Sequence, residues 1–161
     1  MAKLYFRYGA MNSGKSTALM QVAHNYEEQG MRVLILKPKV DTKGSGDLVS
    51  RLGVRRPADL LVPPDMDLVE AVRAASSEGR PLACVLCDES QFLTAEQAEQ
   101  LFMVTVELNI PVICYGLRSD FSLKGFTRDE ARIDSTAASK LALSASSWFT
   151  TPITGFCSRR A

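Results

Sequence analysis

Residues 9–16 read Gly-Ala-Met-Asn-Ser-Gly-Lys-Ser, with a glycine at both ends of a short loop and a lysine and a serine at its close. The apolar run at 4–8 precedes this loop and predicts a buried strand. From Lys15 onward apolar residues recur at helical spacing, and Gly30 lies where such a helix should end. A glycine loop between a strand and a helix predicts a phosphate site, because the loop amides and the positive end of the helix meet at one place.

Every residue of this loop is therefore a candidate for binding the phosphates of ATP. The candidates are Gly9, Ala10, Met11, Asn12, Ser13, Gly14, Lys15 and Ser16. Lys15 is expected to reach the β- and γ-phosphates, and the Ser16 hydroxyl is expected to ligate Mg²⁺. The alternative is a chance glycine turn, which the strand before the loop and the helix after it make the weaker reading.

The rest of the chain alternates apolar runs with helical patterns. Continuous apolar runs, which are typical of strands covered on both faces, lie at 33–36, 83–87 and 111–115. Helices are expected after Asp65, a candidate N-cap, and after Thr94, which opens a capping box with Gln97. Residues 38–64 are rich in Gly and Pro and predict a loop with at most short strands. The alternation predicts an α/β fold, a P-loop NTPase-like parallel sheet with helices on both faces.

Composition and net charge limit the classes of protein and partner to be expected. The chain has 161 residues, 46% of them hydrophobic and 23% charged, which excludes a disordered chain. A net charge of +1 gives no reason to expect nucleic acid or a membrane as partner. The first residues lack a long apolar stretch, so we expect a cytoplasmic protein. Cys84 and Cys87 would project to opposite faces of one strand and are expected to pack in the core, and His24 is expected at the surface.

Two acids follow the apolar run at 83–87. Asp88 is expected to face Mg²⁺ in an ATP site, although it could simply begin the next loop. Glu89 could point to the other side and accept a proton from an acceptor hydroxyl, since phosphoryl transfer needs positioning and a base near the nucleophile. The alternative for Glu89 is a solvated loop carboxylate.

Three segments together resemble the thymidine kinases of the cytosolic, tetrameric type (type II). They are 9–16, the run Asp-Glu-Ser-Gln-Phe-Leu at 88–93, and Cys-Tyr-Gly-Leu-Arg-Ser-Asp-Phe at 114–121. Shorter runs at 22–28, 41–42 and 50–53 are similar to the bacterial branch of that family. The resemblance covers the chain from about Leu4 to Phe121 or Phe126.

The resemblance implies roles for individual residues. It implies that 9–16, together with Asp88, Glu89, Ser90 and Gln91, bind ATP, with Mg²⁺ between Ser16 and Asp88. It implies that Glu89 takes the proton of the thymidine 5′-hydroxyl. Apolar side chains near the thymine base are expected from Met11, Phe92, Phe121 and Phe126, and Arg51 matches a basic position near phosphate. A homo-oligomer, by resemblance a tetramer, is also expected.

The end of the chain departs from this family. The family continues into a small zinc lobe with four metal ligands, which are Cys or His in a tetrahedral site. After Gly116 this sequence offers only Cys157, so the lobe is expected to be missing and no zinc ligand is assigned. We expect a P-loop kinase domain at 1–126 and a divergent Ser/Ala/Thr-rich tail at 127–161, which a truncated or frame-shifted reading would explain.

Three functions are consistent with these expectations. The first is ATP-dependent phosphorylation of thymidine to dTMP in pyrimidine salvage. The second is a non-catalytic ATP-binding remnant of such a kinase, without the zinc lobe and without the long loop that closes over thymidine in this family. The third is a different P-loop NTPase that hydrolyses ATP without a nucleoside.

Overall fold

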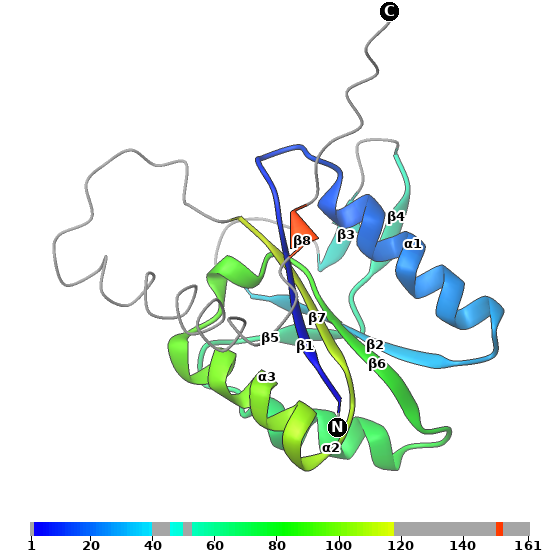
Figure 1. The fold of residues 1–161 in the computed structure, drawn as a ribbon, viewed down its shortest axis with the longest axis vertical. Coiled ribbons are helices and arrows are strands. Elements are labelled where there is room, and N and C mark those ends of the chain that lie inside the picture. Colours follow the sequence, from blue (N-terminus) through cyan, green and yellow to red (C-terminus); the bar gives the residue numbers. More distant parts are fainter. Residues whose placement is uncertain (1, 40–45, 50–52, 118–150, 153–161) are drawn as a thin grey trace, which may run out of the picture.

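A parallel sheet forms the centre of the molecule (Figure 1). The computed structural model describes residues 2–39, 46–49, 53–117 and 151–152. The six strands of the sheet, in their order across it, are β5 (Leu60–Val62), β2 (Arg32–Pro38), β6 (Leu82–Cys87), β7 (Val112–Gly116), β1 (Leu4–Tyr8) and β8 (Thr151–Pro152). Every neighbouring pair in this sheet is parallel. The predicted parallel sheet is confirmed.

In the segment 38–64, predicted as a loop with at most short strands, the described residues after β2 form only short strands, as expected. Two of them, β3 (Asp47–Val49) and β4 (Arg55–Pro57), form a separate antiparallel pair. The third, β5, joins the edge of the main sheet beside β2.

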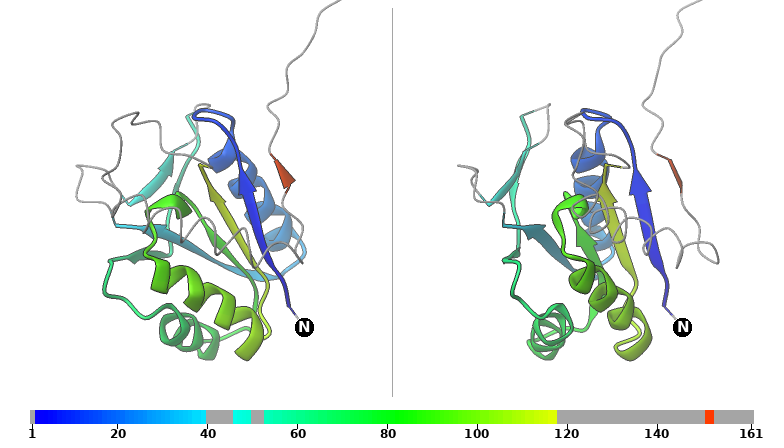
Figure 2. Two further views of the ribbon diagram at one scale, coloured as in Figure 1. Left: turned by 60° about the vertical axis from the view of Figure 1, so that its left-hand side comes forward. Right: turned by 90° about the vertical axis from the view of Figure 1, so that its left-hand side faces the viewer.

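Helices cover both faces of the sheet, as predicted. They are α1 (Lys15–Glu28), α2 (Leu68–Ser77) and α3 (Ala95–Glu107), and a short 3-10 helix, η1 (Ser90–Phe92), follows β6. The views in Figures 1 and 2 show α1 on one side of the sheet and α2 with α3 on the other. None of the helices in the described part of the chain has the length and apolar character needed to cross a membrane.

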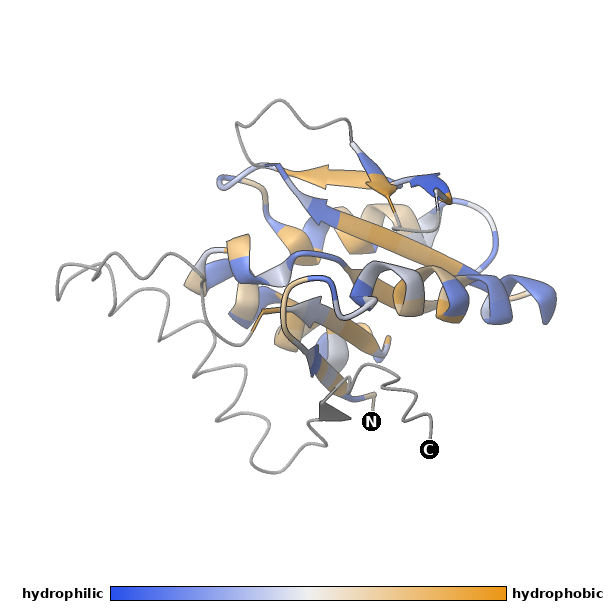
Figure 3. Cartoon of the chain, turned by 90° about the horizontal axis from the view of Figure 1, so that it is seen from above, coloured by the Kyte–Doolittle hydropathy of each residue, from blue (hydrophilic) through white to orange (hydrophobic). Residues whose placement is uncertain are grey.

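Two hydrophobic clusters fill the space between the sheet and these helices. The larger cluster includes Leu68 of α2 and Leu101 of α3, and the smaller one includes Leu19 of α1. Cys87 belongs to the first cluster and Cys84 to the second, and both are fully buried free thiols. The prediction that these two cysteines point to opposite faces is therefore confirmed. Figure 3 shows most strands of the main sheet as hydrophobic and the end of α1 as hydrophilic.

The N-cap predicted for α2 is wrong by two residues. The helix is capped by Asp67, whose Oδ1 accepts hydrogen bonds from the backbone N–H groups of Val69 and Glu70 at 2.9 and 3.1 Å. Asp65 instead lies in a turn that is closed by the N–H of Met66 donating to the carbonyl of Pro63. This turn occupies the residues that a helix capped at Asp65 would have used.

The capping box predicted for α3 is confirmed. The hydroxyl of Thr94 accepts from the N–H of Gln97 at 3.1 Å, and the side chain of Gln97 accepts from the N–H of Thr94 at 3.2 Å. The Gln97 amide also donates to Pro63 O, 2.7 Å away, and so ties the turn before α2 to the start of α3. The inward face of α3 buries Ala98, Leu101, Val104 and Thr105.

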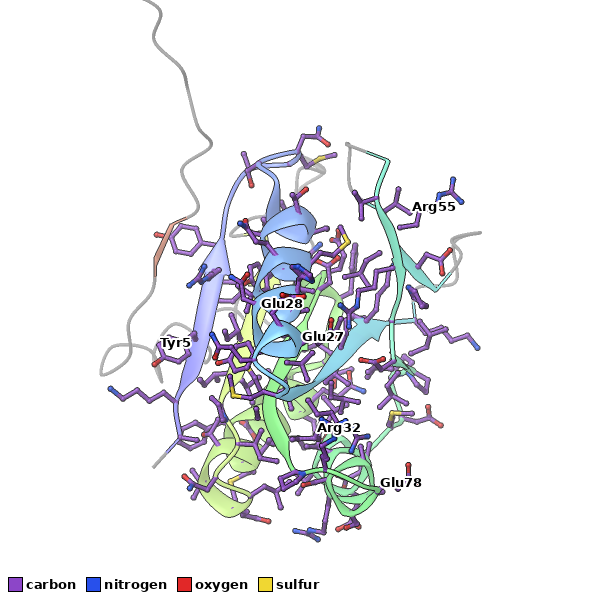
Figure 4. The ribbon with its side chains drawn as sticks, turned by 90° about the vertical axis from the view of Figure 1, so that its right-hand side faces the viewer. Tyr5, Glu27, Glu28, Arg32, Arg55 and Glu78 are labelled. Carbon is purple, nitrogen blue, oxygen red and sulfur yellow. The ribbon has the colours of Figure 1, made fainter. Side chains whose placement is uncertain are left out.

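Two arginine side chains connect elements of the fold that are far apart in the sequence. Arg32 at the start of β2 donates to the carbonyls of Ala75 and Glu78, which satisfies acceptors at the end of α2. Figure 4 shows Arg32 beside Glu78. Arg56 of β4 forms an ion pair with Glu27 of α1, and hydrogen bonding to this guanidinium lowers the pKa of Glu27. The β3–β4 hairpin is thereby attached to α1.

Candidate active site

The predicted site residues that the structure describes lie at one edge of the sheet. In a parallel sheet the carboxyl ends of all strands lie at the same edge, which is where such folds bind ligands. Residues 9–16 follow β1 and Asp88 follows β6, and β7 lies between these two strands. The glycine loop and the acidic pair therefore follow two strands that are separated in the sheet by β7.

The backbone of the glycine loop adopts left-handed conformations at two positions. Asn12 has a φ of 62° and Gly14 a φ of 79°. Gly14 is the N-cap of α1, its carbonyl accepts the N–H of Ala18 at 2.9 Å, and no side chain caps this helix. The first N–H groups of α1 are therefore left for an anion, as in other helix N-termini that bind phosphate.

Lys15 lies back across the loop from which it projects. Its Nζ donates to Ala10 O at 2.7 Å and to Gly9 O at 3.3 Å, and the residue is only 9% exposed. Burial lowers the pKa of Lys15, and the nearby charges of Glu89 and Asp88 oppose this shift. The cation thus lies between the loop and the acidic pair.

Asp88 is joined to the start of α1. The Ser16 hydroxyl donates to Asp88 Oδ2 at 2.9 Å, and Asp88 is 3% exposed. Burial and then the charge of Glu89 raise the pKa of Asp88, while hydrogen bonding from Ser16 lowers it. The Ser16 hydroxyl oxygen and the buried carboxylate of Asp88 are adjacent oxygen ligands of the kind that a small hard cation binds, so the residues present fit Mg²⁺.

Glu89 faces the end of β7 instead. It adopts φ 50° and ψ 38°, a left-handed conformation that is uncommon for residues other than glycine. Its Oε2 accepts a hydrogen bond from the side-chain amide of Gln91, and Gln91 Oε1 accepts from the N–H of Leu117 at 3.2 Å. The neighbouring carboxylates of Asp88 and Glu89 therefore have different partners.

The other residues singled out in the sequence differ in how exposed they are. Met11 in the glycine loop is 50% exposed, and Phe92 at the end of η1 is 54% exposed. Ser90 is buried, and its hydroxyl donates to Tyr115 O at 3.0 Å. His24 is exposed on α1, 3.8 Å from Glu28 Oε1.

Several predictions fall outside the residues that the structure describes. They concern Arg51, Phe121, Phe126, Cys157 and the tail at 127–161 apart from 151–152.

Lys37 was missed in the sequence. Its charge opposes the rise in the pKa of Asp88, and its Nζ donates to Asp47 O at 2.7 Å. A signal was present, because Lys37 and Asp88 are each the first polar residue after a buried apolar run. In the sheet Leu36 pairs with Cys87, so the residues that follow them are neighbours.

A parallel sheet with a strand–glycine loop–helix unit and a serine–aspartate contact beside it defines a P-loop nucleotide-binding protein. Comparison with known proteins identifies the family. Residues 2–139 match the family model described as "Thymidine kinase", and the chain belongs to the thymidine kinase family. The family resemblance seen in the sequence is confirmed.

Curated relatives give the same family. Over 122 residues, the chain is 50% identical to a thymidine kinase of Salmonella typhi and 52% identical to one of Xanthomonas axonopodis pv. citri. Each of these two matches covers 75% of this chain and 58% of the relative. It is 46% identical over 127 residues to a thymidine kinase of Enterobacteria phage T4, covering 78% of this chain and 65% of that protein. The chain therefore spans about three-fifths of the length of these relatives.

Proposed function

We propose that this chain carries the ATP-binding and phosphoryl-transfer part of a thymidine kinase, which converts thymidine to dTMP in pyrimidine salvage. The observation that carries the proposal is the 2.9 Å hydrogen bond from Ser16 to Asp88, which joins the glycine loop to the acidic pair. Family membership supports ATP as the donor and thymidine as the acceptor. Met11 and Phe92 supply exposed apolar surface for the base, and Phe121 and Phe126 are expected to add to it.

The donor half of the reaction depends on residues 9–16. Their backbone N–H groups and the start of α1 would surround the phosphates of ATP, with Lys15 directed to the β- and γ-phosphates. Ser16 and Asp88 are the residues that would hold Mg²⁺. When bound, this ion supplies neutralisation of the negative charge that develops on the phosphates.

Glu89 has the acceptor role. In the proposed reaction the 5′-oxygen of thymidine forms a bond to the γ-phosphorus, the bond from that phosphorus to the β–γ bridging oxygen breaks, and ADP leaves. The proton of the 5′-hydroxyl passes to the carboxylate of Glu89. A carboxylate that accepts a hydrogen bond on one oxygen can still accept this proton on its other oxygen.

Three further expectations belong to the same proposal. Family membership favours a homo-oligomer, and a tetramer and a cytoplasmic location stay predictions. In the described ranges no three His, Cys, Asp or Glu side chains converge on a metal position. That the chain lacks the ligands of the family's zinc site stays a prediction.

A coupled ADP-release assay tests the proposal. Thymidine-dependent release of ADP is the expected result, and Glu89→Gln should lower the rate by about 10²- to 10⁴-fold while ATP binding is retained. ATP binding without ADP formation would assign the chain as a non-catalytic ATP-binding protein. ADP release that is independent of thymidine would assign a different NTPase, and either result overturns the kinase proposal.

A further inference from the structure

The side-chain amide of Gln91 is engaged at both ends. Its Oε1 accepts from the backbone N–H of Leu117 at 3.2 Å, and its Nε2 donates to Glu89 Oε2. Because a backbone N–H can only donate, the amide oxygen has to face Leu117, and the NH₂ group then has to face the carboxylate. The two partners therefore fix the orientation of the amide without ambiguity.

The anchor of this amide is the end of a central strand. Ser90, the residue between Glu89 and Gln91, is buried and donates its hydroxyl to Tyr115 O at 3.0 Å. A Cβ on Gly116 would lie 2.6 Å from Ser90 Oγ, so η1 is in direct contact with the backbone of β7. Gln91 thus connects Glu89 to the backbone of Leu117, the residue that directly follows β7.

The backbone conformation of Glu89 brings its side chain to that of Gln91. In a regular helix, side chains two residues apart do not face each other. The left-handed conformation of Glu89, with φ 50°, interrupts the helical path before η1, and the side chains of Glu89 and Gln91 meet. Such a conformation is strained for a residue other than glycine and is typical of functional sites.

From these contacts we infer that Gln91 is a positioning residue for Glu89, an inference that rests on the proposed role of Glu89 as the base. The amide holds Oε2 of the carboxylate through a neutral N–H donor. Among the described residues Oε1 of Glu89 has no hydrogen-bonding partner, so this oxygen is presented to the acceptor hydroxyl. The role differs from the contact with ATP that the family resemblance implies for Gln91, because both ends of the amide are engaged within the protein.

Replacement of Gln91 separates positioning from ATP binding. Gln91→Met keeps the length of the side chain but removes both hydrogen bonds, and we expect kcat to fall about 10- to 100-fold, since small displacements of a catalytic group have effects of this size. The KM for ATP should change less than about twofold. The matched control is Gln21→Met, the same change on the exposed surface of α1, which should leave both constants unchanged. A raised KM for ATP with an unchanged kcat would overturn the inference.

A double-mutant comparison tests whether Gln91 acts through Glu89. In a Glu89→Gln background the additional change Gln91→Met should lower the residual rate by less than about twofold, because the group being positioned is already gone. Losses that multiply would show that Gln91 acts independently of Glu89, and this outcome contradicts the inference. Thermal unfolding of all variants separates misfolding from lost turnover.

NMR tests the contact without turnover. The side-chain NH₂ signals of Gln91, identified by their loss in Gln91→Met, should shift when Glu89 is changed to Gln and stay in place when the exposed Glu96 is changed to Gln. Unchanged signals in Glu89→Gln overturn the inference even if the wild-type chain is an active kinase. A wild-type chain that forms no thymidine-dependent ADP overturns the proposed function instead, and the NMR result still decides the Glu89–Gln91 hydrogen bond.

Discussion

Gly116 leaves no room for a side chain next to Ser90: a Cβ at Gly116 would lie 2.6 Å from Ser90 Oγ and 3.0 Å from Gln91 Oε1. The close approach joins η1, which follows the acidic pair, to the last residue of β7. We therefore expect Gly116→Ala to destabilise the protein by about 1–3 kcal/mol, as other overpacked interiors do. Urea unfolding measures the change.

A second substitution provides the control for this prediction. Ser90→Ala removes the hydroxyl that Gly116→Ala would meet, so the double variant should be less destabilised than the sum of the two single variants by about 0.5–3 kcal/mol. Strictly additive losses would show that the steric contact is not the cause.

Asp67 rather than Asp65 stabilises the start of α2. Asp67→Ala removes a side chain that accepts two backbone N–H groups, and we expect a loss of about 0.5–2 kcal/mol in the free energy of unfolding. Asp65→Ala is the matched control and should change it by less than about 0.5 kcal/mol. Equal losses for the two variants, measured by thermal or urea unfolding, would contradict the assigned cap.

Without Mg²⁺, the buried negative charge of Asp88 is expected to lower the free energy of unfolding. Its pKa is raised by burial and by Glu89, so the folded protein binds this proton more tightly than the unfolded chain does. The Mg²⁺-free protein should therefore lose stability as the pH rises from the ordinary aspartate value through the raised value. Asp88→Asn removes the buried charge and should raise the Tm at pH 7 by a few degrees.

Calorimetric unfolding in EDTA checks this prediction. The exposed carboxylate of Glu96 offers the control Glu96→Gln, which should leave the Tm unchanged. Added Mg·ATP should raise the Tm of the wild-type chain, and Asp88→Asn should respond less. A lower Tm for Asp88→Asn than for wild type in EDTA would argue against a destabilising charge at this position.

Lys15 is expected to contribute directly to ATP binding. Lys15→Ala removes a cation that hydrogen-bonds to the loop and, in the proposed complex, to the phosphates. Hydrogen bonds to charged groups contribute about 1.5–3 kcal/mol, so the affinity for Mg·ATP should fall roughly 10- to 100-fold. Isothermal titration calorimetry measures this, with the exposed Lys39→Ala as control. Equal affinity of wild type and Lys15→Ala would remove the basis for a phosphate site in this loop.

Local patterns in the sequence determined the elements of this protein. The strand before the glycine loop, the capping box at Thr94 and the opposite directions of Cys84 and Cys87 follow from periodicities and capping rules that act over a few residues. The same patterns indicated that Asp88 and Glu89 directly follow a buried strand. These features could be predicted because the forces that set them act between residues close in sequence.

The tertiary structure decided which of these elements meet. Ser16 and Asp88 are 72 residues apart, and Gln91 and Leu117 are 26 apart, so their contacts depend on the order of β6, β7 and β1 in the sheet. Asp67 replaces Asp65 as a cap because a turn held by a distant helix sets where α2 begins. The order of the strands depends on contacts between segments far apart in the chain, and no local pattern encodes it.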